Sequence, residues 1–214
     1  MSTRLLMRAA RKACTVAAHW KLNLLMAPFY LRFQIRGHGG AWCIFTHMTP
    51  LERLLLYRLG LQQPAGAVLL EVGSYLGASA CFLVAAAEEI GGQVHCVDTW
   101  RNEGMSEGFR DTWQEFRTNT ERYASWIIPH RGHSVDVAGA FDGQLDLLFI
   151  DGDHSYEGCR SDALAWLPHL KPGGIIVMHD YDWAEGVQRV VAELIRPRQR
   201  DRGHMLQHTY WARM

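Results

Sequence analysis

The sequence predicts an α/β fold with a doubly wound, mainly parallel sheet of six or seven strands, preceded by an N-terminal helical arm. First, short apolar runs alternate with segments of helical periodicity from Ala67 onward. Second, these runs are apolar throughout, which is typical of parallel strands covered by helices on both faces. Third, ionisable residues gather at the carboxyl ends of the runs, the edge at which open α/β sheets bind ligands. These residues are Glu71, Asp98, Asp151, His179 and Asp180.

The length and the cysteines bound the class of protein. A chain of 214 residues can bury the core of one α/β domain and is short for two. The five cysteines are an odd set without a Cys-x-x-Cys pair, so we expect reduced thiols in a reducing compartment. We therefore expect a cytoplasmic protein.

Residues 1–48 are predicted to form a basic helical arm or lid, and residues 49–214 the ligand-binding domain. Seven of the 22 basic residues lie within residues 1–51, which contain none of the 22 acidic residues. The apolar segment at residues 22–31 is interrupted by Asn23 and Pro28 and is too short to span a membrane. The arm also lacks the small-residue cleavage site of a secretory signal.

Two interpretations of the arm remain open. In the first, the arm packs over the core or across a homodimer interface. In the second, Phe29, Tyr30, Leu31 and Phe33 contact lipid while arginines meet anionic headgroups, which would make the protein peripheral to a membrane. Nucleic-acid binding is not expected, because the chain after the arm carries an acidic excess.

The remaining elements follow from periodicity and capping signals. A helix is predicted to begin at Pro50, because Thr49 and Glu52 have the spacing of a capping box. Further helices are expected at residues 80–90, 109–123 and 155–167, and from a second capping box at residues 182–185 to Leu194. Strands are expected at residues 67–72, 93–97, 126–129, 145–150, 174–178 and 205–211.

The chain is organised around the strand, glycine turn and helix at residues 67–90. Glu71, Gly73 and Gly77 form the pattern Glu-x-Gly-x-x-x-Gly, which differs from the Gly-x-Gly-x-x-Gly that holds a dinucleotide pyrophosphate. Such a turn lets a nucleotide-like ligand approach bare backbone, and an acidic residue suits a ligand with a cationic end. An ordinary structural turn is the alternative interpretation of this stretch alone.

Taken in order, five segments resemble the class I S-adenosylmethionine-dependent methyltransferases. More narrowly, they resemble the small-molecule and sugar O-methyltransferase branch related to macrocin O-methyltransferase and the cephalosporin hydroxylase-like proteins. The segments are residues 70–79 (LEVGSYLGAS), 97–100 (VDTW), 149–157 (FIDGDHSYE), 170–174 (LKPGG) and 179–181 (HDY). The resemblance spans residues 46–194. It implies a Rossmann-like S-adenosylmethionine-binding methyltransferase domain at residues 49–214, which methylates a hydroxyl of a sugar, a glycosylated metabolite or another small molecule.

The resemblance also implies roles for individual residues. The methionine end of the cofactor would be held by Glu71, the turn Gly73-Ser74 to Gly77, and Ser79. Asp98 would accept hydrogen bonds from the ribose hydroxyls, and Trp100 would border the adenosine. His133 and Ser134 would contact the adenine, and Asp151 would lie near the sulfonium and amino groups. The end of the arm at residues 47–49, including Thr49, would close the pocket.

Two catalytic routes remain open, because methyl transfer requires mainly the alignment of donor and acceptor and the removal of one proton. In the first, Asp151, His179 and Asp180 hold Mg²⁺ or Mn²⁺, which lowers the pKa of the acceptor hydroxyl. His179 departs from the acid or amide of many metal-dependent relatives and weakens the case for Mg²⁺. In the second, His154 or His179 is the general base.

Two alternatives to a methyltransferase remain: a nucleotide-dependent oxidoreductase on the same sheet, and a cofactor-binding scaffold without catalysis. The C-terminus is a further departure from the family, whose members finish with an antiparallel hairpin. This chain shows room for one good strand at residues 205–211, so we expect a truncated edge or one completed by the arm or another subunit.

Overall fold

The computed structural model describes residues 24–102 and 108–214. The chain divides into two compact units between Gly39 and Gly40. In the first unit, residues 24–35 are helical, and the predicted basic residues of the arm before residue 24 lie outside the described residues. Within the described residues, no helix is both long enough and apolar enough to cross a membrane. The predicted arm boundary at residue 48 stays a prediction.

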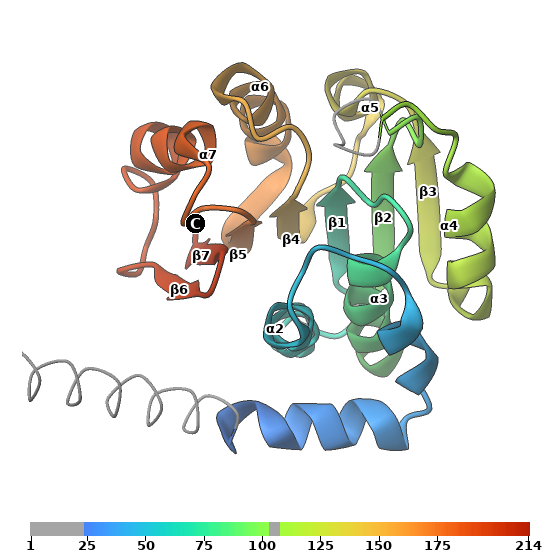
Figure 1. Ribbon diagram of the computed structural model, residues 1–214. Coiled ribbons are helices and arrows are strands. Elements are labelled where there is room, and N and C mark those ends of the chain that lie inside the picture. Colours follow the sequence, from blue (N-terminus) through green and yellow to red (C-terminus); the bar gives the residue numbers. More distant parts are fainter. Residues whose placement is uncertain (1–23, 103–107) are drawn as a thin grey trace, which may run out of the picture. The chain divides into compact units, whose positions relative to one another are not determined.

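The second unit is built on one seven-stranded sheet with the strand order β3-β2-β1-β4-β5-β7-β6 (Figure 1). The strands are β1 (Val68–Val72), β2 (Gln93–Asp98), β3 (Ile127–Arg131), β4 (Leu145–Ile150), β5 (Leu170–Met178), β6 (His204–Leu206) and β7 (Thr209–Arg213). Strands β1 to β5 pair in parallel, and β7 pairs antiparallel with both β5 and β6. The predicted doubly wound, mainly parallel sheet is confirmed.

Helices cover both faces of this sheet. The helices are α2 (Pro50–Leu61), α3 (Ala78–Ile90), α4 (Trp113–Thr120), α5 (Ser134–Ala140), α6 (Tyr156–Trp166) and α7 (Glu185–Val190). Short helical turns are η1 (Gly39–Cys43), η2 (Glu121–Tyr123), η3 (Leu167–His169) and the π-helical turn η4 (Val191–Ile195). Helix α3 packs against α2 and α4, whereas α6 packs against α5 and α7, so the two sets form separate layers (Figure 1).

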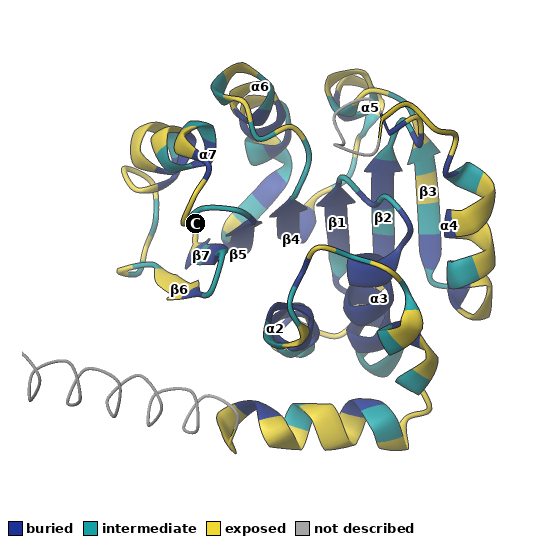
Figure 2. Cartoon of the chain, in the orientation of Figure 1, coloured by how far each residue is buried: buried dark blue, intermediate teal, exposed yellow. Residues whose placement is uncertain are grey.

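The core lies between these layers and the central strands. Every residue of β4 is buried, and Figure 2 shows the same dark, buried colour along β1. Trp166 on α6 and Phe82 on α3 are two of the large apolar side chains that are fully buried in these layers. Each such side chain contributes about 1.5–3 kcal/mol by leaving water. The uninterrupted apolar runs of the sequence therefore correspond to strands buried on both faces.

One predicted capping box is present and the other is not. At α2, the backbone N–H of Thr49 donates to Glu52 Oε2 over 3.0 Å, and the Thr49 hydroxyl receives the N–H of Glu52. At α7, the cap position is Ala184 and no side chain caps it, so the predicted box at residues 182–185 is wrong. The Asp182 carboxylate instead lies 2.7 Å from Nδ1 of His208. Asp182 therefore pairs with His208, which is distant in the sequence, and does not cap the nearby helix α7.

The C-terminus forms an antiparallel hairpin, which corrects the expectation of a single strand at residues 205–211. The run breaks at Gln207, whose φ of 51° turns the chain between β6 and β7. A non-glycine residue rarely adopts a positive φ, so the sequence carries no glycine signal for this turn. Strand β7 pairs with β5 and β6 completes the edge, so these described strands need no other subunit to form it.

The contact between α2 and α3 requires a small residue at position 60. A Cβ on Gly60 would lie 2.6 Å from the Cβ of Ala86, whereas a Cβ on Gly139 in helix α5 would meet nothing within 4 Å. We expect Gly60→Ala to lower the free energy of unfolding by about 1–3 kcal/mol through overpacking. Gly139→Ala should raise it by up to about 1 kcal/mol through helix propensity. Urea unfolding of both variants checks this pair, and a Gly60→Ala protein as stable as the wild type would contradict it.

Candidate functional site

A cavity of about 570 Å³ lies at the carboxyl ends of the parallel strands. Residues that directly follow or end four strands line it: Gly73 after β1, Asp98 at the end of β2, Gly132 after β3 and Asp151 after β4. Strands β1 and β4 are neighbours from which the sheet is wound in opposite directions, and open α/β sheets bind ligands at such a switch point. The volume suits one small-molecule ligand.

The turn after β1 forms one wall of the cavity and requires glycine. Gly73 has a φ of 87° and donates its N–H to the carbonyl of Val97 over 2.9 Å. A Cβ on Gly73 would lie 2.1 Å from the carbonyl oxygen of Asp151. The turns after β1 and β4 therefore touch through backbone, and a ligand can approach that backbone closely.

Four residues predicted to hold the ligand lie behind this turn and do not line the cavity: Glu71, Ser74, Gly77 and Ser79. The carboxyl of Glu71 has no exposure and no aligned hydrogen-bond partner among the described residues. Burial raises the pKa of Glu71 to about 8, although the hydroxyls of Ser79 and Ser74 favour its ionised form. A Cβ on Gly77 would meet Thr120 of helix α4 at 2.6 Å, so this glycine serves packing.

Asp98 organises the second wall. Its Oδ2 accepts the N–H of Tyr75 over 2.8 Å, and its Oδ1 accepts the N–H of Trp100 over 2.6 Å. Trp100 does not line the cavity. Its ring is fully buried against Trp113 and Phe116, and its Nε1 donates to the carbonyl of Tyr75 over 3.0 Å. Each oxygen of Asp98 thus accepts a backbone N–H, and the residue lies in the wall of the cavity.

The end of β3 contributes His133 and Ser134, as predicted, and both line the cavity. They begin helix α5, which the sequence analysis missed. Ser134 is held in place by Trp166, whose Nε1 donates to the hydroxyl over 2.8 Å. Asp162 of α6 lines the same region and was also missed; burial raises its pKa to about 6. The sequence did carry a signal for Asp162, because it is an acidic residue on the otherwise apolar face of α6.

A cluster of three groups occupies the opposite end of the predicted site: Asp151, His154 and Asp180 each offer a ligand atom within 4.8 Å of the others. His154 Nε2 lies 3.0 Å from Asp180 Oδ2 and 3.7 Å from Asp151 Oδ1. This nitrogen is buried, yet it has no aligned hydrogen-bond partner among the described residues. The contacts with Asp151 and Asp180 nevertheless outweigh desolvation and raise the pKa of His154 to about 9. Such an arrangement can hold a divalent cation.

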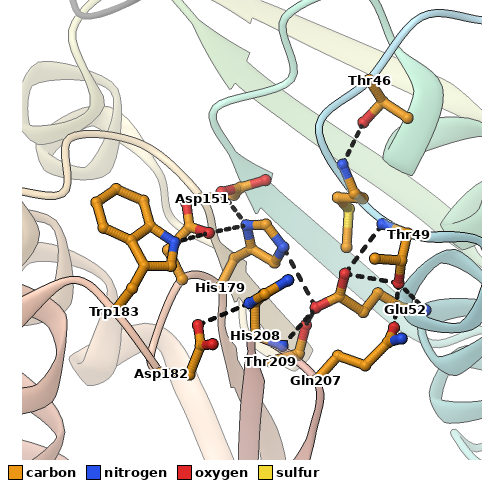
Figure 3. A network of polar contacts seen from close by, with 12 residues as sticks. Thr46, Thr49, Glu52, Asp151, His179, Asp182, Trp183, Gln207, His208 and Thr209 are labelled. Atoms are coloured by element: carbon orange, nitrogen blue, oxygen red, sulfur yellow. Dashed lines mark hydrogen bonds and ion pairs between the residues drawn. The ribbon is translucent and has the colours of Figure 1, made fainter.

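His179 lies behind this cluster and is 4% exposed. Nδ1 is 3.0 Å from Asp151 Oδ1 and 3.3 Å from Asp180 Oδ1, while Nε2 is 3.5 Å from Glu52 Oε1 (Figure 3). Both ring nitrogens therefore face carboxylates and not the cavity. Burial alone would lower the pKa of His179, but these carboxylates raise it well above its usual range. The geometry favours His154 over His179 as the nitrogen donor of the cluster.

Thr49, predicted to help close the pocket, does not line the cavity. Its hydroxyl contacts Glu52 and Gln207, so it belongs to the network drawn in Figure 3. Glu52 has no exposure, and its Oε1 accepts the N–H of His208 over 2.9 Å and the hydroxyl of Thr209 over 3.0 Å. The sequence indicated only the capping role of Glu52.

Comparison with known proteins identifies the class. A family model described as a methyltransferase domain matches residues 70–181, and the chain belongs to this family. The match covers the glycine turn, Asp98 and the cluster that follows β4 and β5, and it confirms the predicted methyltransferase. It disfavours the oxidoreductase and the non-catalytic scaffold.

Among curated proteins, an uncharacterized protein of Sinorhizobium fredii, y4gI, is 29% identical over 139 residues. The match covers 60% of this chain and only 15% of that protein's length. This relative extends well beyond the part that is shared.

Several solved structures share the fold. TomG from Streptomyces achromogenes, an O-methyltransferase in complex with SAM, has a TM-score of 0.62 at 16% identity over 78% of this chain and 81% of its own. An O-methyltransferase from Bacillus cereus in complex with SAH has a TM-score of 0.61 at 17% identity over 88% and 91%. CalS11, a TDP-rhamnose 3'-O-methyltransferase of calicheamicin biosynthesis, has a TM-score of 0.60 at 15% identity over 76% and 77%. At these identities the likeness establishes the fold.

The two turns that touch at Gly73 give the first test of the site. We expect Gly73→Ala to lower the free energy of unfolding by about 3 kcal/mol, because a left-handed conformation and a backbone clash act together. Gly91 has a φ of 67° with nothing within 4 Å of its Cβ position. Gly91→Ala therefore carries the conformational strain alone, about 1 kcal/mol. Equal losses for the two variants in urea unfolding would show that the approach to Asp151 imposes no constraint.

Proposed function

We propose that the protein is an S-adenosylmethionine-dependent O-methyltransferase acting on a hydroxyl of a sugar or another small molecule. The observation that carries this proposal is one cavity at the β1/β4 switch point that joins Asp98 to the cluster of Asp151 and His154. The structures of TomG in complex with SAM and of the Bacillus cereus enzyme in complex with SAH support this methyl donor. CalS11, a TDP-rhamnose 3'-O-methyltransferase, supports a sugar acceptor.

The residues fit the methyl donor at three points. Asp98 lines the cavity with a carboxylate, an acceptor group, and would receive the two ribose hydroxyls. His133 and Ser134 would border the adenine. Asp151, at the other end, offers a negative charge to the cationic sulfonium and amino groups. The walls would align the donor while excluding water, which is the larger part of what methyl transfer requires.

The cluster of Asp151, His154 and Asp180 fits a divalent cation. Its half-buried donor groups lie within 4.8 Å of one another, and His154 Nε2 is 3.0 Å from Asp180 Oδ2. A nitrogen among the donors favours Mn²⁺ over Mg²⁺. The cation, when bound, would lower the pKa of the acceptor hydroxyl. The metal-free alternative uses the same cluster, with His154 as the general base.

Calorimetric titration with S-adenosylhomocysteine tests the donor. We expect wild-type binding in the micromolar range and about 10- to 100-fold weaker binding by Asp98→Ala, which removes a charged acceptor of two hydrogen bonds. Asp142→Ala, at an exposed acid, is the control and should bind as the wild type does. Asp180→Ala should keep its affinity for S-adenosylhomocysteine and lose methyl transfer to a panel of nucleotide sugars. Unchanged affinity in Asp98→Ala would contradict the ribose role.

We also propose a cytoplasmic protein that touches an anionic membrane through the helix at residues 24–35. Of the residues predicted to contact lipid, Phe33 is fully buried and that part of the prediction is wrong, whereas Leu31 is 59% exposed. Leu31 shares one face of this helix with Leu24 and Ile35, which are 69% and 75% exposed. The basic, acid-free character of residues 1–51 supports an anionic lipid over a neutral surface. A second copy of the chain is the alternative occupant of this face.

Sedimentation with lipid vesicles tests the membrane contact. We expect the wild type to sediment with phosphatidylglycerol vesicles, less so at high salt, and to stay in solution with phosphatidylcholine alone. The double variant Leu31→Gln/Ile35→Gln should lose most of this binding. Leu164→Gln, at an exposed leucine of α6, is the matched control. Equal sedimentation of the double variant and the control would remove the membrane proposal, and concentration-dependent dimerisation lost in the double variant would favour a second copy.

A further inference from the structure

We propose that His179 is a positioning residue: its ring holds the Asp151 carboxylate in the orientation needed to bind the divalent cation, and Glu52 holds the ring. The inference rests on the proposed function, because the cation site is part of it. It gives His179 a place in the reaction without contact with the cation or the ligand, and it gives Glu52 a role beyond capping α2.

The backbone fixes where the His179 ring begins. His179 follows β5 and donates its N–H to the carbonyl of Ile150 over 3.1 Å, so the parallel pairing with β4 continues one residue past the strand. Asp151 likewise donates its N–H to the carbonyl of Val72 over 2.9 Å. The Cα atoms of His179 and Asp151 are therefore held by the sheet itself, and only the side-chain torsions remain to be set.

The ring contacts set those torsions. Nδ1 of His179 shares a hydrogen bond with Asp151 Oδ1 at 3.0 Å, and Nε2 on the far side of the ring faces Glu52 Oε1 at 3.5 Å (Figure 3). Because the two nitrogens lie on opposite sides of a rigid ring, a fixed anion at Nε2 favours the rotamer that presents Nδ1 to Asp151. Residues that orient metal ligands in this way affect metal affinity strongly.

Glu52 is such a fixed anion. Its Oε2 receives the backbone N–H and the hydroxyl of Thr49, at 3.0 and 2.8 Å. Its Oε1 accepts hydrogen bonds from the backbone N–H of His208 and the hydroxyl of Thr209. His208 lies in the turn between β6 and β7, and Thr209 is the first residue of β7. Desolvation would raise the pKa of Glu52, but the hydrogen bonds from His179 and Thr49 lower it to about 2. The carboxylate is thus held by two segments that do not touch the cavity.

Two substitutions at His179 separate its contact with Asp151 from its contact with Glu52. In His179→Asn, the amide nitrogen can replace Nδ1 and donate to Asp151, while the reach to Glu52 is lost. In His179→Gln, the amide nitrogen can replace Nε2 and meet Glu52, while the donor to Asp151 is lost. The probe is Mn²⁺ alone, titrated by electron paramagnetic resonance into the full-length protein. Calorimetry with S-adenosylhomocysteine confirms that each variant keeps its donor site.

The expected order of Mn²⁺ affinity is wild type, His179→Asn, then His179→Gln, with the last about 10- to 100-fold below the wild type. His204→Gln, at a half-exposed histidine of β6, is the control and should match the wild type. If His179 had a merely structural role, the Mn²⁺ affinity of each variant would follow its stability in urea. It would not depend on whether the amide nitrogen replaces Nδ1 or Nε2. Equal affinities in His179→Asn and His179→Gln would overturn the proposal.

Electron spin-echo envelope modulation of bound Mn²⁺ provides a second measurement that does not depend on the fold of His179→Gln. We expect the signal of one coordinated nitrogen in the wild type, retained in His179→Asn and absent from His154→Gln. A nitrogen signal lost in His179→Asn and kept in His154→Gln would make His179 a ligand and overturn the positioning role. Absence of Mn²⁺ binding by the wild type overturns this inference, whereas absence of S-adenosylhomocysteine binding is what would refute the proposed function.

Discussion

The cavity depends on how closely the turn after β1 approaches the turn after β4. The carbonyl oxygen of Asp151 lies only 2.1 Å from where a Cβ on Gly73 would be, so no other residue fits there without moving backbone. This contact lies between the two central strands, at the point where the winding of the sheet changes direction. It brings bare backbone from β1 beside an acidic side chain from β4 within one cavity. A ligand with a sugar hydroxyl pair and a cationic end meets complementary groups along that line.

Two buried glutamates show how burial and partners decide the state of a charge. Glu52 and Glu71 are both fully buried. Hydrogen bonds and the charge of His179 lower the pKa of Glu52 to about 2 despite desolvation. Glu71 lacks aligned partners among the described residues, and desolvation raises its pKa to about 8. At neutral pH Glu52 is therefore an anion that can orient a neighbour, whereas Glu71 is largely a neutral group beneath the glycine turn.

The sequence was sufficient for the sheet and for the edge that carries the site, because apolar runs and strand ends are local patterns. It was less informative about which side chains reach the cavity. Glu71 precedes the last residue of β1 and points away, since successive strand residues face opposite sides. Trp100 was expected at the ligand and instead packs beneath Asp98, because its neighbours Trp113 and Phe116 come from a distant helix. The C-terminal hairpin was missed for a related reason: the positive φ of Gln207 is set by tertiary contacts and has no glycine to mark it.

Glu52 joins three segments that are far apart in the sequence: the start of α2, the turn into β7 and the residue after β5. Its hydrogen bonds to those segments are to a buried charge, and bonds of that kind contribute about 1.5–3 kcal/mol each. Glu52 contacts the His179 ring, and that ring in turn contacts the carboxylate of Asp151. Glu52 thus couples the orientation of a cavity carboxylate to the C-terminal hairpin, so substitutions in that hairpin can reach the chemistry without touching a ligand.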